Sequence, residues 1–312
     1  RRQRQMCIRD RFYKTDFPTR TRRLVTKIHA AVKPIKGLTL RGSFSYNYWD
    51  RRVEQHLTDR DLYRFTAEGP VLIREGVVRT YIRRYNYANT YRASELTADY
   101  NFKVSRLEAS LLVGVSQEYD KDENERFLRY DLIDDSLTSI DAAATNGAIG
   151  GNYTEWAMRS YFGRLNLNWD DKYLLEVNMR ADGSSKFAPG HRWGYFPSVS
   201  AGWRISEESF MKWSSSWLDN LKIRASFGST GNGQVDNYLF LSKIAIKKNL
   251  GFLTGDSPLI YADKPSLIPD GLTWETVSTY DLGLDWEMLN GRLSIVADIY
   301  RKNTTDMYVV RP

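Results

Sequence analysis

The stretch "YLLEVNMRAD" at residues 173–182 alternates between two kinds of side chain. Its odd-numbered positions are apolar, whereas its even-numbered positions after Leu174 are polar or charged. Successive side chains of a β-strand point to opposite faces, so this period of two predicts a strand with one apolar face and one polar face. The following segment "PSVSAGWRI" at 197–205 alternates in the same way and predicts a second strand of this kind.

The alternation recurs on both sides of this stretch. It is clear at 38–49, 96–102, 164–169, 221–228, 280–288 and 292–301, and looser at 24–33 and 107–119. These segments together predict about ten strands, and no helical periodicity extends over about eleven residues. The sequence therefore predicts an all-β fold.

The links between the predicted strands alternate between short and long. The short links are "PIKG", "KVSR", "DDK" and "LNG", and 206–220 is of medium length. The links 50–90, 120–157 and 229–275 are long, and 183–193 is shorter. Membrane barrels alternate short periplasmic turns with longer extracellular loops, whereas unstructured loops of about 40 residues are rare in compact soluble domains. This order predicts a transmembrane antiparallel up-and-down β-barrel.

An alternative is a soluble or surface β-sandwich carbohydrate-binding module, in which two apolar faces meet. Alternation alone does not separate the two folds. Aromatic residues near strand ends, such as Trp169, Tyr173 and Trp203, fit the interfacial girdles of a barrel. The polar faces carry Arg, Asp, Glu and Asn with few Lys, which fits a wet lumen. These two features favour the barrel.

The net charge of +7 does not indicate a nucleic-acid surface. Residues 1–23 hold 8 Arg and 1 Lys against 2 Asp, which leaves 36 basic and 36 acidic residues in the remaining chain. The segment 1–11, "RRQRQMCIRDR", resembles translated sequencing-adaptor DNA and is predicted to be non-biological. It contains the only cysteine, Cys7, so we expect no disulfide and no thiolate metal site.

The segment 180–210 contains residue types of a hydrolase site, namely Asp182, Ser184, Ser185 and His191. Its "DGSSK" lacks the G-x-S-x-G frame and reads as turn chemistry. Its "SEESF" at 206–210 predicts a short helical turn with carboxylates near its start. "GSTGNG" at 228–233 has no Lys-Ser/Thr and is no phosphate loop. We therefore predict no enzyme, no catalytic residue, no cofactor and no metal site.

Several long segments resemble one family in the same order along the chain. They are "KPIKGLTLRGSFSYNY" (33–48), "LLEVNMRADGSSKFAPGHRWGYFPSVSAGWRISEESFM" (174–211), "LDNLKIRASFGSTGN" (218–232) and "LTWETVSTYDLGLDWEMLNGRLSIVADIYRKNTTDMYV" (272–309). They resemble the SusC/RagA family of TonB-dependent (TonB-linked) outer-membrane transporters. The resemblance covers nearly all of residues 12–312, which are expected to be a partial TonB-dependent receptor β-barrel domain.

This resemblance implies a plugged barrel of about 22 strands, of which the chain would hold about ten central ones. The signal peptide, plug domain, TonB box and closing strands are expected to lie outside it. The family implies a SusD-like surface lipoprotein as a lid and energy delivered by TonB through the plug. It also implies outer-membrane lipid around the barrel of a Gram-negative bacterium, and an oligosaccharide or peptide ligand.

Two sets of residues are candidates for function. Those predicted from alternation to face the lumen are Arg164, Asn166, Asn168, Glu176, Asn178, Arg180, Asp182, Arg204, Arg224, Asp281 and Asp285. They fit hydrogen bonding in the barrel wall or contact with the plug as well as ligand binding. Aromatic residues predicted to lie in long loops, where they would touch ligand or lipoprotein, are Tyr81, Tyr85, Tyr87, Tyr153, Trp156, Tyr238 and Phe240.

Overall fold

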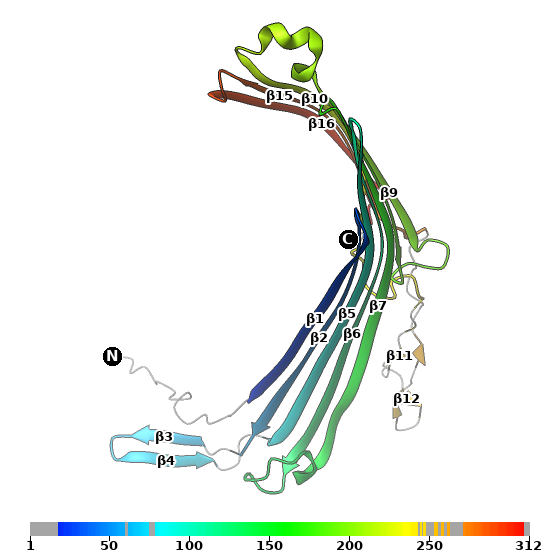
Figure 1. The fold of residues 1–312 in the computed structure, drawn as a ribbon. Helices are drawn as coiled ribbons and strands as arrows, with labels where there is room; N and C mark the ends of the chain where they lie inside the picture. Colours follow the sequence, from blue (N-terminus) through cyan, green and yellow to red (C-terminus); the bar gives the residue numbers. More distant parts are fainter. Residues whose placement is uncertain are drawn as a thin grey trace. The chain divides into compact units, whose positions relative to one another are not determined.

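A computed structural model of the chain describes residues 18–59, 62–74, 79–242, 244, 246–247, 253–254, 257–258, 261–262 and 271–308. The segment 1–11, predicted to be non-biological, and its Cys7 lie outside the described residues. The main element is one 10-stranded sheet whose strands pair in chain order, β1-β2-β5-β6-β7-β8-β9-β10-β15-β16 (Figure 1). This up-and-down order confirms the predicted all-β fold class.

Each of the ten predicted strands coincides with a strand of this sheet, and only Ile205 and Arg292 of the predicted segments lie outside one. The strands are β1 (Thr19–Ile35), β2 (Leu38–Leu57), β5 (Tyr81–Val104), β6 (Leu107–Leu132), β7 (Ala143–Trp169), β8 (Tyr173–Ser184), β9 (Trp193–Arg204), β10 (Leu218–Asn232), β15 (Glu275–Met288) and β16 (Leu293–Thr305). The other described strands form three two-stranded ladders, β3 (Leu62–Thr66) with β4 (Gly69–Arg74), β11 (Ile246–Lys247) with β14 (Tyr261–Ala262) and β12 (Leu253–Thr254) with β13 (Ser257–Pro258). A sandwich needs a second large sheet, and the described strands form none.

The predicted long links 50–90 and 120–157 are largely strands, so this part of the prediction was wrong. β2 continues to Leu57 and β5 begins at Tyr81, while β6 continues to Leu132 and β7 begins at Ala143. β7 is 27 residues long, whereas about 9–11 tilted residues cross a bilayer. Both faces of these extensions carry polar side chains, so the extensions lack apolar alternation. The strands were predicted from that alternation, which is why their extensions were not.

The chain divides into two compact units. The first comprises residues 1–26, 46–91 and 120–155, and therefore holds the strand extensions and the β3–β4 hairpin. Ion pairs join neighbouring strands within it, with Arg84 Nε 3.1 Å from Glu54 Oε1. Arg79, which precedes β5, lies 2.7 Å from a carboxylate oxygen of Asp131 in β6.

The second unit comprises residues 27–45, 92–119 and 156–312. Its ladders place two very different rows of side chains next to each other across six strands. One row is apolar and consists of Leu167, Leu175, Ala201, Ala225, Leu282 and Ile299. The adjacent row, on the opposite face, consists of Asn166, Glu176, Ser200, Ser226, Asp281 and Tyr300. We call these two surfaces the apolar face and the polar face.

A small hydrophobic cluster holds the connections at one end of the second unit. Phe187, Phe196, Leu272 and Trp274 are buried in it, and Phe187 is fully buried. The Trp274 indole N–H donates to the Arg192 carbonyl at 2.9 Å, which ties residue 274 to the connection after β8. We call this group the loop cluster.

The connection between β9 and β10 lies at the other end and contains two 3-10 helices, η2 (Ile205–Glu207) and η3 (Ser209–Ser214) (Figure 1). They confirm the short helical turn predicted at "SEESF". A third short helix, η1 (Ile140–Ala142), precedes β7. Across the described residues, no helix has the length and hydropathy needed to cross a membrane.

Candidate functional site

The register of β7 to β10 and β15 brings all eleven candidate lumen residues onto the polar face. Arg164 lies opposite Asn178, Asn166 opposite Glu176, and Lys222 opposite both Arg204 and Asp285. Directly paired residues of an antiparallel ladder share a face, and so do residues two apart on one strand. The remaining candidates follow from these pairs by steps of two along each strand. Their position facing a lumen stays a prediction.

Hydrogen bonds join candidates of β7 and β8 in one group that reaches Ser198 of β9, and candidates of β8 in a second group. The Arg164 Nε–H donates to Asn178 Oδ1 at 2.7 Å, and the Asn178 amide donates to Glu176 Oε1 at 2.7 Å and Ser198 Oγ at 3.2 Å. The Arg180 guanidinium donates to both Asp182 oxygens at 2.8 Å. It also donates to Ser160 Oγ at 3.1 Å, and Ser160 is almost completely buried. These side chains are therefore held in place by one another.

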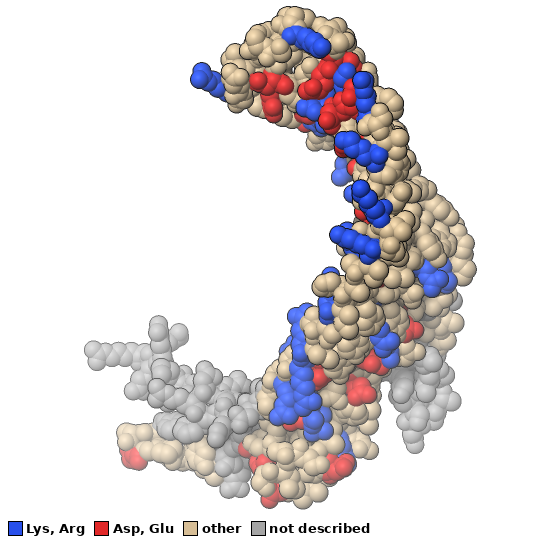
Figure 2. All heavy atoms as spheres, viewed as in Figure 1, with Lys and Arg blue, Asp and Glu red and all other residues tan. Residues whose placement is uncertain are grey.

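A second cluster centres on Arg224 in β10. Its Nε–H lies 3.0 Å from both carboxylate oxygens of Asp285, and its Nη2–H lies 3.0 Å from Asp298 Oδ1. Gly283 leaves the space for this arrangement, because a Cβ there would lie 2.4 Å from Asp298 Oδ1 and 2.8 Å from Arg224 Cζ. Figure 2 shows acidic and basic side chains close together at the η2–η3 end of the sheet.

Arg204 lies apart from this cluster. Its guanidinium contacts the Asp171 carbonyl at 3.4 Å and Glu207 Oε1 at 3.7 Å. Two residues of the polar face were not among the predicted ones, namely Asp298 in this cluster and Lys222 beside Arg204. The alternation already seen at 292–301 and 221–228 contained the signal for both residues.

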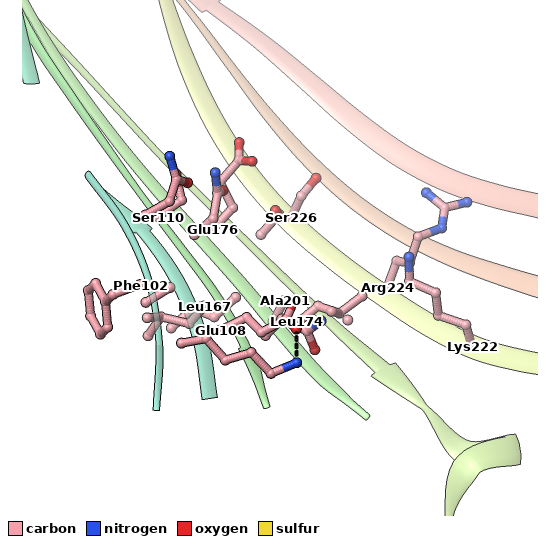
Figure 3. A pocket seen from close by; sticks show the side chains of 18 of the residues that line it. Phe102, Glu108, Ser110, Leu167, Leu174, Glu176, Ala201, Lys222, Arg224 and Ser226 are labelled. Atoms are coloured by element: carbon pink, nitrogen blue, oxygen red, sulfur yellow. Dashed lines mark hydrogen bonds and ion pairs between the residues drawn. The ribbon is translucent and has the colours of Figure 1, made fainter. Parts of the chain in front are cut away.

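The polar face is hollowed near the short turns into a groove of about 930 Å³. Its lining includes Glu176, Lys222, Arg224 and Ser226, and Figure 3 shows the Glu176, Ser226 and Arg224 side chains projecting on the same side of the strands. Both signs of charge line this groove together with hydroxyl groups. These groups suit polar contacts along the groove.

The first unit contains a smaller hollow of about 340 Å³ between β5, β6 and β7. The rings of Tyr85 and Tyr87 are stacked there, with centroids 6.2 Å apart and an interplanar angle of 15°. The Asn124 amide donates to Asn152 Oδ1, and the rest of the lining consists of Glu125, Arg126, Gly150 and Gly151. Aromatic ring faces thus lie beside amide and guanidinium groups. Asn124, Arg126 and Asn152 were not among the predicted residues, because they lie in strand extensions that were predicted to be loops.

Five of the seven candidate loop aromatics lie in strands, which corrects their predicted location. Tyr81, Tyr85 and Tyr87 belong to β5, and Tyr153 and Trp156 belong to β7. Tyr238 and Phe240 do lie in the connection after β10, where both are partly buried. Tyr153 follows Asn152 directly and so points to the other face of β7, where Lys121 Nζ lies 5.3 Å from its ring centroid.

No group of three or more His, Cys, Asp or Glu side chains suited to a metal ion occurs among the residues that the structure describes. The histidine of the segment 180–210, His191, is exposed, and its carbonyl accepts a hydrogen bond from the Thr273 hydroxyl at 3.4 Å. The backbone of His191 thus helps to fix the loop cluster. Asp182, from the same segment, is paired with Arg180 on the polar face.

Comparisons with known proteins agree on one family. The family model described as "TonB dependent receptor-like, beta-barrel" matches residues 9–312. The TonB-dependent receptor SusC of Bacteroides thetaiotaomicron is 36% identical over 149 residues, which are 47% of this chain and 15% of SusC. The TonB-dependent receptor P39 of Formosa agariphila is 29% identical over 287 residues, which are 89% of this chain and 25% of that protein. The chain thus spans a quarter or less of these two relatives.

A solved structure of the RagAB peptide transporter shares the fold. It superimposes with a TM-score of 0.78 at 23% sequence identity, covering 96% of this chain and 32% of the compared chain. At this identity the likeness concerns the fold alone.

Proposed function

Because the chain belongs to the TonB-dependent receptor-like β-barrel family, we propose that it forms part of the wall of a SusC-like importer. The importer would take up oligosaccharides, or peptides, across the outer membrane of a Gram-negative bacterium with energy supplied through TonB. The observation that carries this proposal is the two-faced sheet, in which an apolar row and a polar row run side by side across six strands.

The apolar face supports a position in the membrane. Val177 and Val199 are paired in the β8–β9 register, and each is 40% exposed. Leu282 belongs to the same apolar face and is 53% exposed. An apolar patch of this extent is unfavourable in water and marks a surface that another apolar phase covers. On β9, Tyr195 and Trp203 limit a band of about nine residues, close to the roughly 9–11 that a tilted strand needs to cross a bilayer.

The polar face supports an inward orientation. Several of its charged groups are paired with one another, as in the Arg180–Asp182 and Arg224–Asp285–Asp298 contacts, which lowers the cost of keeping charge in the wall. We propose that this face lines the lumen, holds the plug through which TonB acts and meets a SusD-like lipoprotein at the side opposite the short turns.

For the ligand, the Tyr85–Tyr87 hollow favours an oligosaccharide over a peptide. Two nearly parallel ring faces offer flat apolar surfaces to the C–H faces of sugar rings. The amides of Asn124 and Asn152 both donate and accept hydrogen bonds, as sugar hydroxyls do. Sites of this kind combine aromatic surface with a few placed polar groups. A peptide remains the second candidate, and the test in the Discussion separates the two.

Cysteine labelling of the full-length protein in outer-membrane vesicles tests the orientation of the two faces. Single cysteines replace Leu165, Leu175 and Ile223 on the apolar face, or Asn166, Glu176 and Arg224 on the polar face. We expect a lipid-soluble maleimide, and no charged aqueous maleimide, to label the first set. Rapid aqueous labelling of the apolar set would contradict the membrane position. Protection of that set from both reagents would favour the sandwich alternative, whose apolar faces meet in a core.

A further inference from the structure

The β9–β10 connection, residues 205–217, differs from the other connections at its end of the sheet. Its neighbours there are the connections 36–37, 105–106, 170–172 and 289–292, each of two to four residues. This longer connection carries η3, a six-residue 3-10 helix. Residues three apart eclipse each other in such a helix, so it presents distinct stripes of side chains.

The stripes of η3 have different surroundings. Met211 and Ser214 form the inward stripe, where Ser214 is 1% exposed and its hydroxyl donates to the Met211 carbonyl at 2.7 Å. Phe210 and Trp213 form an outward stripe and are 58% and 71% exposed. Trp217 extends this stripe, with its ring centroid 6.1 Å from that of Trp213. Three large aromatic side chains therefore project from one short segment.

Glu208, between η2 and η3, shows on which side of the sheet the segment lies. Its Oε1 accepts hydrogen bonds from the Tyr173 hydroxyl at 2.6 Å and from the Trp203 indole N–H at 3.1 Å. Tyr173 and Trp203 are paired in the β8–β9 register and share the apolar face with Leu175 and Ala201. The connection is thus fastened to the end of the apolar face.

We propose that residues 205–217 form an interfacial anchor, in which Phe210, Trp213 and Trp217 insert between the lipid headgroups and acyl chains of the adjacent leaflet. This inference rests on the membrane position given under the proposed function. The segment would contact lipid at the membrane surface, beyond the ends of the strands.

Three observations favour lipid over a protein partner. The segment that carries the stripe is fastened through Glu208 to Tyr173 and Trp203 of the apolar face, which form a stacked pair with centroids 6.5 Å apart. Tryptophan combines a large apolar ring with one N–H donor, which suits the boundary between headgroups and acyl chains. Lys212 is exposed beside the stripe and Lys172 lies 3.6 Å from Glu208 Oε2, so positive charge lies at the level of the lipid phosphates.

Spin labelling measures the depth of the stripe directly. In the full-length protein, freed of native cysteines and placed in vesicles of phosphatidylethanolamine and phosphatidylglycerol, a label is attached at Trp213→Cys or Phe210→Cys. Collisions with oxygen report the acyl region, and collisions with a water-soluble nickel chelate report the aqueous phase. Lys212→Cys, on another stripe of the same helix, is the matched control, and Val199→Cys reports the middle of the apolar face.

We expect the ratio of oxygen to nickel collisions at Trp213→Cys to exceed that at Lys212→Cys severalfold and to approach that at Val199→Cys. Equal nickel access at positions 212 and 213 would overturn the anchor, and so would protection of position 213 from both reagents, which indicates a protein partner. Nickel access at Val199→Cys would instead overturn the membrane position, so the two failures are distinguishable.

A second measurement uses the native tryptophan. Brominated phospholipids quench tryptophan fluorescence only on contact, so replacing Trp213 by Phe should remove part of the quenchable emission while leaving an aromatic ring in the stripe. An unchanged quenchable fraction in Trp213→Phe would contradict insertion of this side chain.

Discussion

At the scale of single residues, Glu208 connects the segment before η3 to the apolar face. The hydrogen bonds from Tyr173 and Trp203, together with the nearby Lys172 ammonium, lower the pKa of the Glu208 carboxyl below its ordinary value. A carboxyl with a lowered folded-state pKa stabilises the fold above its unfolded-state pKa. This contribution is lost as the pH falls through the folded-state pKa.

The variant Glu208→Gln should therefore be less stable than the wild type at neutral pH, and the difference should vanish in acid. Urea unfolding in detergent micelles, followed by tryptophan fluorescence across a pH series, measures this difference. Glu207→Gln is the matched control, since Glu207 is exposed and its nearest cation, Arg204, lies 3.7 Å away. A stability gap between wild type and Glu208→Gln that stays constant from neutral to acidic pH would contradict the assignment.

A substitution at Gly283 tests how tightly the Arg224 cluster is packed. A methyl group there would overlap Asp298 and Arg224, so Gly283→Ala should destabilise the barrel by about 1–3 kcal/mol, as overpacking does elsewhere. Gly228→Ala is the control, because its Cβ would lie at an ordinary 3.5 Å from the Ser198 Cβ. The shift in the midpoint of urea unfolding compares the two variants. Equal midpoints for the two variants would show that the Asp298 and Arg224 side chains move aside without a loss of stability.

At the scale of elements, the sequence predicts which strands exist far better than where they end. Leu175 and Glu176 alternate because β8 has an apolar face on one side and a polar face on the other, and such a difference leaves a period of two. Asp120 to Arg126 in β6 are mostly charged at consecutive positions, so no period survives although the strand continues. The polar face was predictable for the same reason, whereas the Tyr85–Tyr87 hollow was not, since it lies in these extensions.

The loop cluster determines how firmly the connections at its end of the sheet are held. Phe187 is fully buried against Trp274, with ring centroids 5.2 Å apart. Phe187→Ala should remove roughly 3–5 kcal/mol of local packing and release residues 185–192 and 233–241. Hydrogen exchange should accelerate in these segments while β8 and β10 stay protected. Trp213→Ala serves as a control, since it removes an exposed ring elsewhere, and equal exchange in both variants would contradict the assignment.

At the scale of the whole molecule, the proposed importer needs a wall that is apolar outside, polar inside and in contact with ligand above the membrane. The ladders of the second unit supply the two faces, and the stacked tyrosines of the first unit are the surface proposed for sugar rings. In the proposed importer, this surface, the plug and the lipoprotein would together determine which ligand passes. Substitutions in this chain can therefore be tested for their effect on ligand affinity and import rate in the full-length importer.

Replacing both Tyr85 and Tyr87 by Ala should slow import of the oligosaccharide on which the host grows about tenfold or more, since each lost stacking contact is worth about 1 kcal/mol or more. Growth on that oligosaccharide as sole carbon source, in a strain carrying only the variant gene, measures the change. Tyr153→Ala, on the other face of β7, is the matched control. Loss of growth on peptides with normal growth on every oligosaccharide would favour the peptide importer instead.

The pairing of all ten strands in chain order also has a consequence for the route of assembly. Most neighbouring strands are joined by a short connection, and such local closures cost little chain entropy, so hairpins can form early. The seam between β10 and β15 is different, because the connection 233–274 separates its two strands. This seam is expected to close late in biogenesis, and to be the place where a stalled folding intermediate stands open.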